Sequence, residues 1–171
     1  MAAQPRVRYT GSATGNMLRD SALALVPETL DHYVELGRAL WQDGPLRPAE
    51  IEVARLRNAQ RVNCVFCRSA RYDIAVADGL SEERVDMIGD AYMDSDLSDR
   101  EKLIVAFTDY FLLDPAGMPQ EFRECLQRSF SGEELAHLSL AVAYFSGFSR
   151  CAVALGGMPD ELPRMQISIP E

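Results

Sequence analysis

Glu52-Val-Ala-Arg-Leu-Arg-Asn-Ala-Gln-Arg-Val-Asn-Cys64-Val-Phe-Cys67 places a carboxylate twelve residues before the first of two closely spaced cysteines. Asn63 is a suitable N-cap, so we predict a helix from Cys64 to Gly79 with both cysteines near its first turn. A free thiol has a pKa of about 8.5, and a helix N-terminus with cations nearby lowers it. The segment therefore predicts a reactive thiol pair, although half of a zinc site has the same spacing.

The rest of the chain also has the pattern of helices. Ser98 with Glu101, and Ser131 with Glu134, each form a capping box in front of an apolar helix. A strand-like alternation is visible only around Gln166–Ile169. We therefore predict one all-α domain over residues 1–171, a bundle of about six to eight helices with a core at about 17–156. The predicted helices begin near Met17 and continue over about Glu28–Trp41, Pro48 to Ala59 or Arg61, Ser81–Asp90, Ser98 onward, Pro119–Ser129 and Ser131–Leu155, between irregular tails at 1–16 and 157–171.

The last predicted helix has two separate apolar stripes. A helix that is apolar on two sides is buried on both. Ser146, Gly147 and Ser149 would also let another backbone approach closely. We therefore expect this helix to lie inside the fold or between subunits, and the protein to be a homo-oligomer. One stripe is Leu135, Leu138, Val142 and Phe145, and the other is Leu140, Tyr144, Phe148, Cys151 and Leu155.

Composition narrows the classes of function. The chain has 171 residues, a formal net charge of −9 and no cluster of Lys or Arg, which argues against a nucleic-acid partner. No apolar run approaches the roughly 20 residues that span a bilayer, so we expect no membrane partner. Four cysteines are too few for a disulfide-rich secreted scaffold. We therefore expect a cytoplasmic protein, in which Cys-x-x-Cys is more often catalytic or metal-binding than structural.

Charged residues near the cysteines suggest how a thiolate would form. Arg68 follows Cys64 by four residues and Arg71 follows Cys67 by four, so on a helix both guanidiniums would stabilise a thiolate. Glu52 could accept a thiol proton if burial raises its pKa. An unbroken helix would hold Glu52 about 18 Å from Cys64. The chain must therefore turn back before the cysteines, or a neighbouring subunit must supply the carboxylate.

The chain has Glu52, then eleven residues, then Cys64-x-x-Cys67, all within a helical pattern. This arrangement resembles the alkylhydroperoxidase D-like or carboxymuconolactone decarboxylase-like superfamily. The resemblance extends from about Val26 to Gly156. It implies a helical bundle that assembles as a dimer, trimer or hexamer and reduces peroxides or disulfides with the cysteine pair. In that scheme Cys67 attacks the substrate, Cys64 resolves the intermediate and Glu52 belongs to a proton relay.

The chain departs from the redox-active members of this superfamily at two positions. It has Arg71 where these members usually carry a histidine, and Phe66 between the cysteines where some carry another. Arginine cannot shuttle protons at neutral pH, although it can stabilise a thiolate. The resemblance and these departures imply an activated dithiol with weak or altered peroxidase activity. It would need no bound cofactor, because an external dithiol or a reductase would supply the electrons.

Other functions fit parts of the same pattern. Members that decarboxylate or process lactones do not need the cysteine pair, and a helical oligomer could also be non-catalytic. Glu134 and His137 match half of the Glu-x-x-His pattern of di-iron bundles, but the chain has no second copy. A zinc site would need two more ligands, so we expect no metal. The other Cys and His residues show no suitable spacing: Cys125, Cys151, His32 and His137.

Several of these side chains also have a structural interpretation. Glu52 could be an exposed carboxylate paired with Arg55, three residues later. Arg71 could equally pair with a surface carboxylate. We expect Cys125 and Cys151 to be buried small hydrophobic residues. Three aromatic residues could line a substrate pocket, although aromatics on helices more often belong to a core: Trp41, Tyr72 and Tyr144.

Overall fold

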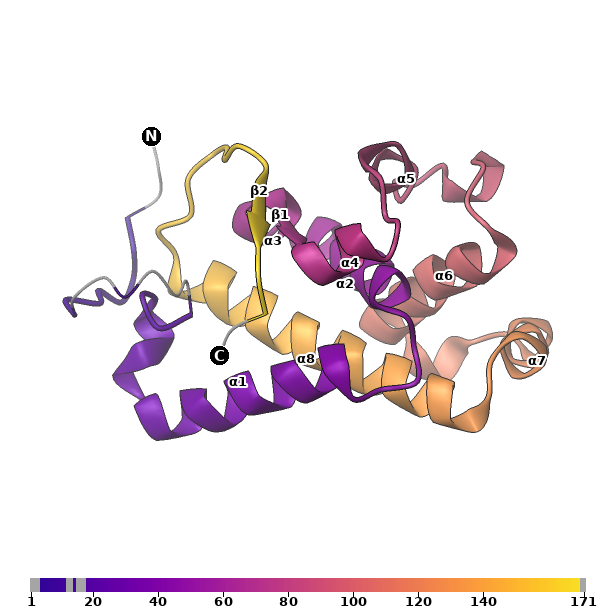
Figure 1. Cartoon of the computed structure of the whole chain (residues 1–171), viewed down its shortest axis with the longest axis horizontal. Coiled ribbons are helices and arrows are strands. Elements are labelled where there is room, and N and C mark those ends of the chain that lie inside the picture. Colours follow the sequence, from indigo (N-terminus) through magenta and orange to yellow (C-terminus); the bar gives the residue numbers. More distant parts are fainter. Residues whose placement is uncertain (1–3, 12–13, 15–17, 170–171) are drawn as a thin grey trace.

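The chain folds into a succession of helices, many of which begin or end at proline, serine or glycine residues (Figure 1). The computed structural model describes residues 4–11, 14 and 18–169, so the predicted helix start near Met17 lies outside the described residues. The all-α prediction is confirmed, because the described residues form eight α-helices, three short 3-10 helices and one two-stranded sheet. In chain order the elements are η1 (Ala22–Leu25), α1 (Pro27–Gln42), α2 (Pro48–Val62), α3 (Val65–Ser69), β1 (Ala70–Tyr72), α4 (Asp73–Ala77), α5 (Glu82–Asp86), η2 (Tyr92–Asp94), α6 (Asp99–Leu113), η3 (Pro115–Gly117), α7 (Gln120–Ser129), α8 (Gly132–Leu155) and β2 (Met165–Ile167).

Most predicted helix ends lie close to the observed ones. Ser98 accepts the backbone N–H of Glu101 in front of α6, and Ser131 accepts that of Glu134 in front of α8. Both capping boxes are therefore present as predicted. At the other end of α8, Gly156 has a φ of 78°, a conformation that glycine adopts without steric cost. These boundaries depend only on neighbours in the sequence, which is why local patterns predict them.

The single helix predicted from Cys64 to Gly79 is wrong. α3 stops at Ser69, and the chain then extends as β1, which pairs in parallel with β2. The register places Ala70 opposite Met165, a partner near the other end of the chain. Helical periodicity cannot reveal a pairing over such a sequence distance. The weak strand pattern predicted near the C-terminus belongs to this small sheet.

Asn63 also has a different role from the predicted one. Its φ of 55° is left-handed and ends α2, whereas Cys64 is the N-cap of α3. Asparagine tolerates this conformation better than most residues. The N–H of Cys64 then donates to the carbonyl oxygen of Ala59 at 3.0 Å. The reversal at Asn63 thus folds α3 back against the helix that precedes it.

α8 packs against α2 and lies beside α1 (Figure 1). The Tyr33 hydroxyl donates to the carbonyl oxygen of Tyr144, and the His137 ring contacts the carbonyl oxygen of Leu40. Residue numbers therefore fall along α8 as they rise along α1, and the two helices are antiparallel. α8 is long and apolar enough to cross a bilayer by length and composition alone. Here, however, one of its sides packs on α2 and α6 through Leu138, Ala141, Val142 and Phe145, as in the core of a folded domain.

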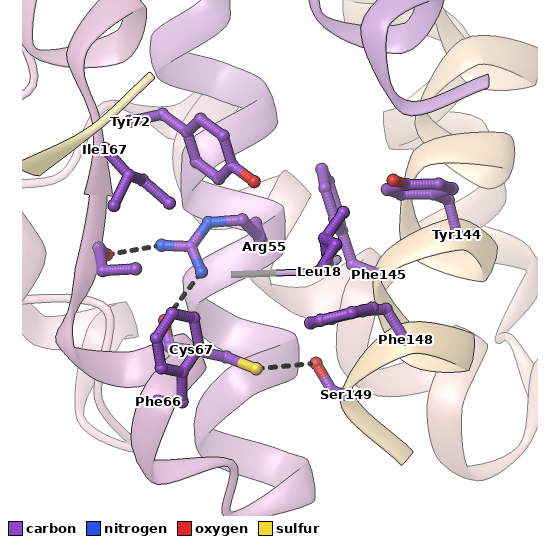
Figure 2. Close-up of a pocket in the computed structure, with 11 residues that line it drawn as sticks. Leu18, Arg55, Phe66, Cys67, Tyr72, Tyr144, Phe145, Phe148, Ser149 and Ile167 are labelled. Carbon is purple, nitrogen blue, oxygen red and sulfur yellow. Dashed lines mark hydrogen bonds between the residues drawn. The ribbon is translucent and has the colours of Figure 1, made fainter. Parts of the chain in front are cut away.

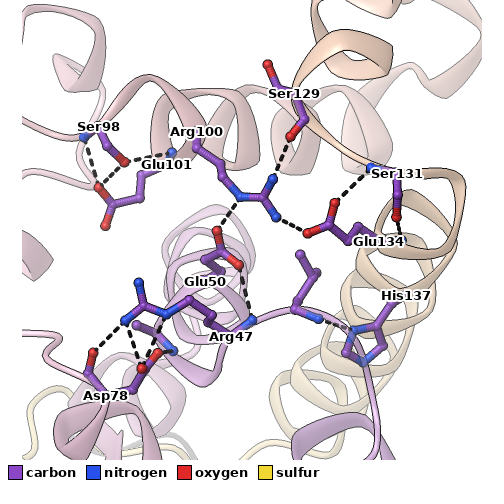
Figure 3. A network of polar contacts seen from close by, with 12 residues as sticks. Arg47, Glu50, Asp78, Ser98, Arg100, Glu101, Ser129, Ser131, Glu134 and His137 are labelled. Atoms are coloured by element: carbon purple, nitrogen blue, oxygen red, sulfur yellow. Dashed lines mark hydrogen bonds and ion pairs between the residues drawn. The ribbon is translucent and has the colours of Figure 1, made fainter.

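A network of charged groups joins three helices at the end of the bundle far from the cysteines (Figure 3). Arg100 of α6 bonds Glu50 of α2 and Glu134 of α8. It also donates to the carbonyl oxygen of Ser129 at 2.5 Å. One guanidinium therefore fixes the relative positions of α2, α6 and α8 at this end.

His137 lies beside the turn between α1 and α2, where it is buried. Its Nδ1 accepts the N–H of Leu46 at 3.4 Å, so its Nε2–H donates to the carbonyl oxygen of Leu40 at 3.0 Å. Gly44 sits against the imidazole so closely that an added Cβ would overlap it. His137 is therefore a core histidine that holds the turn.

We expect Gly44→Ala to lower the free energy of unfolding by about 1–3 kcal/mol, because the methyl group displaces a buried imidazole and its hydrogen bonds. Urea unfolding followed by circular dichroism measures the loss. Gly132→Ala is the matched control, since nothing lies within 4 Å of its added Cβ. A Gly44→Ala protein as stable as the Gly132→Ala protein would contradict the packing described here.

Candidate functional site

Cys64 and Cys67 lie at the start of α3 and are joined by a disulfide. The Cys64 sulfur accepts the backbone N–H of Cys67 at 3.2 Å. Cys64 is fully buried, and Cys67 is 5% exposed. Burial by itself favours an uncharged thiol, so a reactive thiolate here needs polar groups around it. The surrounding apolar residues are Ala59, Phe66, Phe148, Val153 and Met158.

Arg55 reaches the cysteine segment from the neighbouring helix α2. Its Nη1 donates to the carbonyl oxygen of Cys67 at 2.6 Å, and its Nη2 donates to that of Ala70 at 2.7 Å. The guanidinium thus holds both ends of the turn between α3 and β1. This contact exists because the chain reverses at Asn63, which was one of the two conditions for bringing Glu52 near the cysteines.

Glu52 and Arg55 form a buried ion pair. The Nε and Nη2 groups of Arg55 each donate to one carboxylate oxygen of Glu52 at 2.6 Å. The N–H of Tyr72 also donates to Glu52, at 3.4 Å. Burial alone would lower the pKa of Arg55, but the Glu52 carboxylate raises it above its usual value, so the guanidinium stays charged. The pairing with Arg55 occurs as the structural interpretation suggested, but in the interior and not on the surface.

The two arginines predicted to stabilise a thiolate have other surroundings. Arg71 pairs with Glu82 at 2.8 Å and donates to the carbonyl oxygens of Arg68 and Ala70. Arg68 is exposed. Because β1 interrupts the predicted helix, Arg71 does not follow Cys67 on one helical face. Neither arginine lines the cavity beside Cys67, so their assignment as thiolate stabilisers stays a prediction.

A cavity of about 30 Å³ lies next to Cys67, between α2, α3 and α8 (Figure 2). Arg55, Tyr72 and Tyr144 supply polar groups to its wall. Burial raises the pKa of Tyr72 to about 12 and also raises that of Tyr144, so both phenols are neutral near pH 7. The cavity has room for about one water-sized group. Its other lining residues are Leu18, Phe66, Ala70, Phe145, Phe148, Ser149 and Ile167.

Ser149 of α8 directly contacts the Cys67 sulfur. Its hydroxyl donates to Sγ at 3.4 Å, and the Nδ2 of Asn58 donates to the Ser149 oxygen at 3.0 Å. The sequence pattern indicated Ser149 only as a small residue that permits close packing, and it did not indicate Asn58 at all. The signal that could have found them is a pair of polar residues on otherwise buried helix faces.

The remaining candidate residues lie in the core, on the cavity wall or at the surface. Trp41 is buried in the core, whereas Tyr72 and Tyr144 line the cavity. The expectation of two buried cysteines is wrong, because Cys151 is exposed and Cys125 is partly exposed. α2 and α6 cover one apolar stripe of α8. α1 contacts the other stripe at Tyr144, whereas Leu140 and Cys151 of that stripe are exposed. Within the described ranges, no three His, Cys, Asp or Glu side chains cluster as metal ligands would.

Comparisons with known proteins agree with this architecture. A family model for the carboxymuconolactone decarboxylase family matches residues 27–93. A structure from Agrobacterium tumefaciens, of a protein of unknown function described as a candidate antioxidant defence protein AhpD, has a TM-score of 0.67 and 22% identity, over 89% of this chain and 95% of that chain. An uncharacterized peroxidase-related protein from Silicibacter sp. TM1040 has a TM-score of 0.66 and 17% identity, over 78% of this chain and 71% of that chain. No curated protein matches the chain.

We expect Arg55→Met to lower the free energy of unfolding by about 3–5 kcal/mol, because it leaves the buried Glu52 carboxylate without its partner. Arg164→Met is the control, since its ion pairs are exposed and should contribute less than about 1 kcal/mol. Urea unfolding compares the two variants. Equal losses would show that the interior pair contributes no more than a surface pair.

Proposed function

We propose that the chain is a member of the alkylhydroperoxidase D-like and carboxymuconolactone decarboxylase-like superfamily and that it is a thiol–disulfide oxidoreductase that reduces peroxides or disulfides. The family match over residues 27–93 and the fold shared with the two solved structures support this proposal. One observation carries this proposal. Cys64 and Cys67 are within bonding distance of each other, and Cys67 lines a small cavity. Two thiols in this arrangement can transfer two electrons to a substrate and store the oxidation as a disulfide.

Cys67 is the proposed nucleophile, since it lines the cavity while Cys64 is fully buried behind it. The Cys67 thiolate attacks one peroxide oxygen, the O–O bond breaks, and the departing oxygen takes a proton to leave as an alcohol or water. Cys67 is then a sulfenic acid. The Cys64 thiol attacks this sulfur, a disulfide forms and water leaves. One peroxide is reduced while two thiols are oxidised.

The size of the cavity supports a peroxide as the oxidant. About 30 Å³ accommodates the oxygen end of a peroxide but no bulky group. An external dithiol or a reductase would then return two electrons to the disulfide by thiol–disulfide exchange, and no bound cofactor is required. We place this cycle in a reducing cytoplasm.

We also propose that the protein works as a homo-oligomer, a dimer, trimer or hexamer. Leu140 of α8 is 59% exposed and Leu36 of α1 is 47% exposed, on two helices that lie side by side. A second copy that covers these side chains would bury apolar surface and cover the part of the second α8 stripe that α1 leaves exposed. We propose in addition that α8 faces the partner subunit and that the whole chain forms one domain.

Among the cations, Arg55 is better placed to favour a Cys67 thiolate than Arg68 or Arg71. It lines the same cavity as Cys67 and bonds the carbonyl oxygen of that residue. Glu52 has both carboxylate oxygens bonded to Arg55, which supports a role in holding the guanidinium. Its role as a proton relay stays a prediction, which the pH dependence of a Glu52→Gln variant would test.

A second candidate function is a cofactor-free decarboxylase or lactone-processing enzyme. The match of residues 27–93 to the carboxymuconolactone decarboxylase family favours it. In that case the cysteines would be secondary. A Cys64→Ser, Cys67→Ser double variant would then keep its turnover of a small carboxylate or lactone.

The proposed redox function predicts distinct behaviour for each cysteine variant. We expect Cys67→Ser to abolish peroxide consumption. Cys64→Ser should support one turnover only, because the sulfenic acid on Cys67 has no resolving thiol and reacts with dimedone. Peroxide consumption with dithiothreitol as donor compares Cys67→Ser with the parent. The single turnover of Cys64→Ser is measured on pre-reduced protein without an external thiol, because dithiothreitol would itself reduce the sulfenic acid, and mass spectrometry identifies the products.

Cys151→Ser is the matched control, since Cys151 is exposed and lies outside the pair. We expect its activity to equal that of the parent. If the Cys64→Ser, Cys67→Ser double variant consumed peroxide as fast as the parent, the redox proposal would be wrong.

A further inference from the structure

Asn58, Ser149 and Cys67 form a buried chain of hydrogen bonds across the interface between α2 and α8. Asn58 is fully buried, and Ser149 is 2% exposed. The amide of Asn58 donates to the Ser149 oxygen at 3.0 Å, and the Ser149 hydroxyl donates to the Cys67 sulfur at 3.4 Å. Figure 2 shows the last of these contacts, with the hydroxyl directed at the sulfur. The side chain that contacts the sulfur is therefore an uncharged donor.

The other end of the Asn58 amide is unsatisfied. Its Oδ1 is buried and has no hydrogen-bond partner, and it is the only such side-chain N or O atom in the described part of the chain. Leaving a buried acceptor unpaired costs free energy comparable to a lost hydrogen bond. The arrangement therefore needs a compensating reason.

A half-turn of the amide would pair its oxygen with Ser149 and move its NH2 group to the position where the oxygen now has no partner. It would place Oδ1 opposite Ser149, whose hydroxyl could then donate to Oδ1 in place of the Cys67 sulfur. The sulfur would lose its donor. A disulfide sulfur accepts hydrogen bonds weakly, whereas a thiolate is a charged and much stronger acceptor. The charge on the sulfur thus decides which amide orientation is favoured.

We propose that Ser149 is a catalytic residue that holds a hydroxyl proton on the reactive sulfur, and that Asn58 is the positioning residue that keeps this proton directed there. The proposal rests on the redox function proposed above and adds how the thiolate is stabilised. No covalent bond of Ser149 or Asn58 changes in the cycle. Their hydrogen bonds strengthen when Cys67 is reduced and ionised, and weaken when the disulfide forms.

The other groups around Cys67 leave this task to Ser149. From α2, Arg55 is paired with Glu52 and donates to the carbonyl oxygen of Cys67 and not to its sulfur. From β1 and α8, Tyr72 and Tyr144 are neutral phenols with raised pKa values. The Cys67 N–H is directed to the sulfur of Cys64, the partner cysteine on α3. The remaining lining residues are apolar, so the Ser149 hydroxyl is the donor that contacts the Cys67 sulfur.

The test uses the full chain with Cys64→Ser, which isolates Cys67 and keeps it reduced. The rate of alkylation of Cys67 by iodoacetamide, measured by mass spectrometry between pH 4 and pH 9, gives the midpoint of its ionisation. We expect Ser149→Ala to raise this midpoint by about one unit, because the thiolate loses its donor. Ser149→Thr keeps the hydroxyl and should restore the lower midpoint. Asn58→Leu should shift it in the same direction as Ser149→Ala.

Ser146→Ala is the matched control, on the same helix one turn earlier. Ser146 is also buried, but its hydroxyl oxygen accepts from Arg150 and does not contact sulfur. We expect no shift for this variant. If Asn58→Leu fails to fold, the variants Ser149→Ala, Ser149→Thr and Ser146→Ala still test the proposal.

The outcomes separate this proposal from the redox function itself. A low midpoint in the Cys64→Ser parent that Ser149→Ala does not raise would overturn the role of Ser149 and leave the redox function intact. A parent midpoint near 8.5, the value of a free thiol, would overturn both. A low midpoint that rises with Ser149→Ala and returns with Ser149→Thr would support both.

Discussion

The buried ion pair between Glu52 and Arg55 is the interaction on which the cysteine segment depends. α3 has five residues and β1 has three, so neither element is stable by its own hydrogen bonds. Arg55 donates to the carbonyl oxygens of Cys67 and Ala70, where α3 ends and β1 begins. Glu52 accepts the N–H of Tyr72. An unpaired charge in this place would cost several kcal/mol, so each partner requires the other.

The same pairing determines the electrostatics around the sulfurs. A guanidinium held by a carboxylate carries little net charge as seen from Cys67, although it lines the same cavity. Uncharged donors therefore matter more at this site than in one with a free cation beside the thiol. In an apolar interior a single hydrogen bond is electrostatically stronger than in water. The contact of Ser149 with the Cys67 sulfur gains its importance from these surroundings.

The sequence predicted the cysteine pair, the capped helices and one buried apolar stripe of α8, because each depends on residues close together in the chain. It did not predict the surroundings of the cysteines. Nine consecutive residues of α2, from Ile51 to Ala59, are buried, and they include Glu52, Arg55 and Asn58. Charged and polar residues are usually exposed, so their pattern indicates a surface helix. Only the packing of α8, α6 and α3 around α2 places these residues inside.

Local sequence information was enough for the elements and for the two cysteines, since helix caps, apolar periodicity and the Cys-x-x-Cys spacing act within a few residues. The polar partners of the sulfurs come from contacts between distant segments. Asn58 meets Ser149 across the α2–α8 interface, and β1 is formed by pairing with β2 near the C-terminus. Such contacts exist only after the helices have packed, because the energy that selects them comes from burial shared by whole elements. The helices could therefore be read from neighbouring residues, whereas the environment of Cys67 was decided by the folded chain.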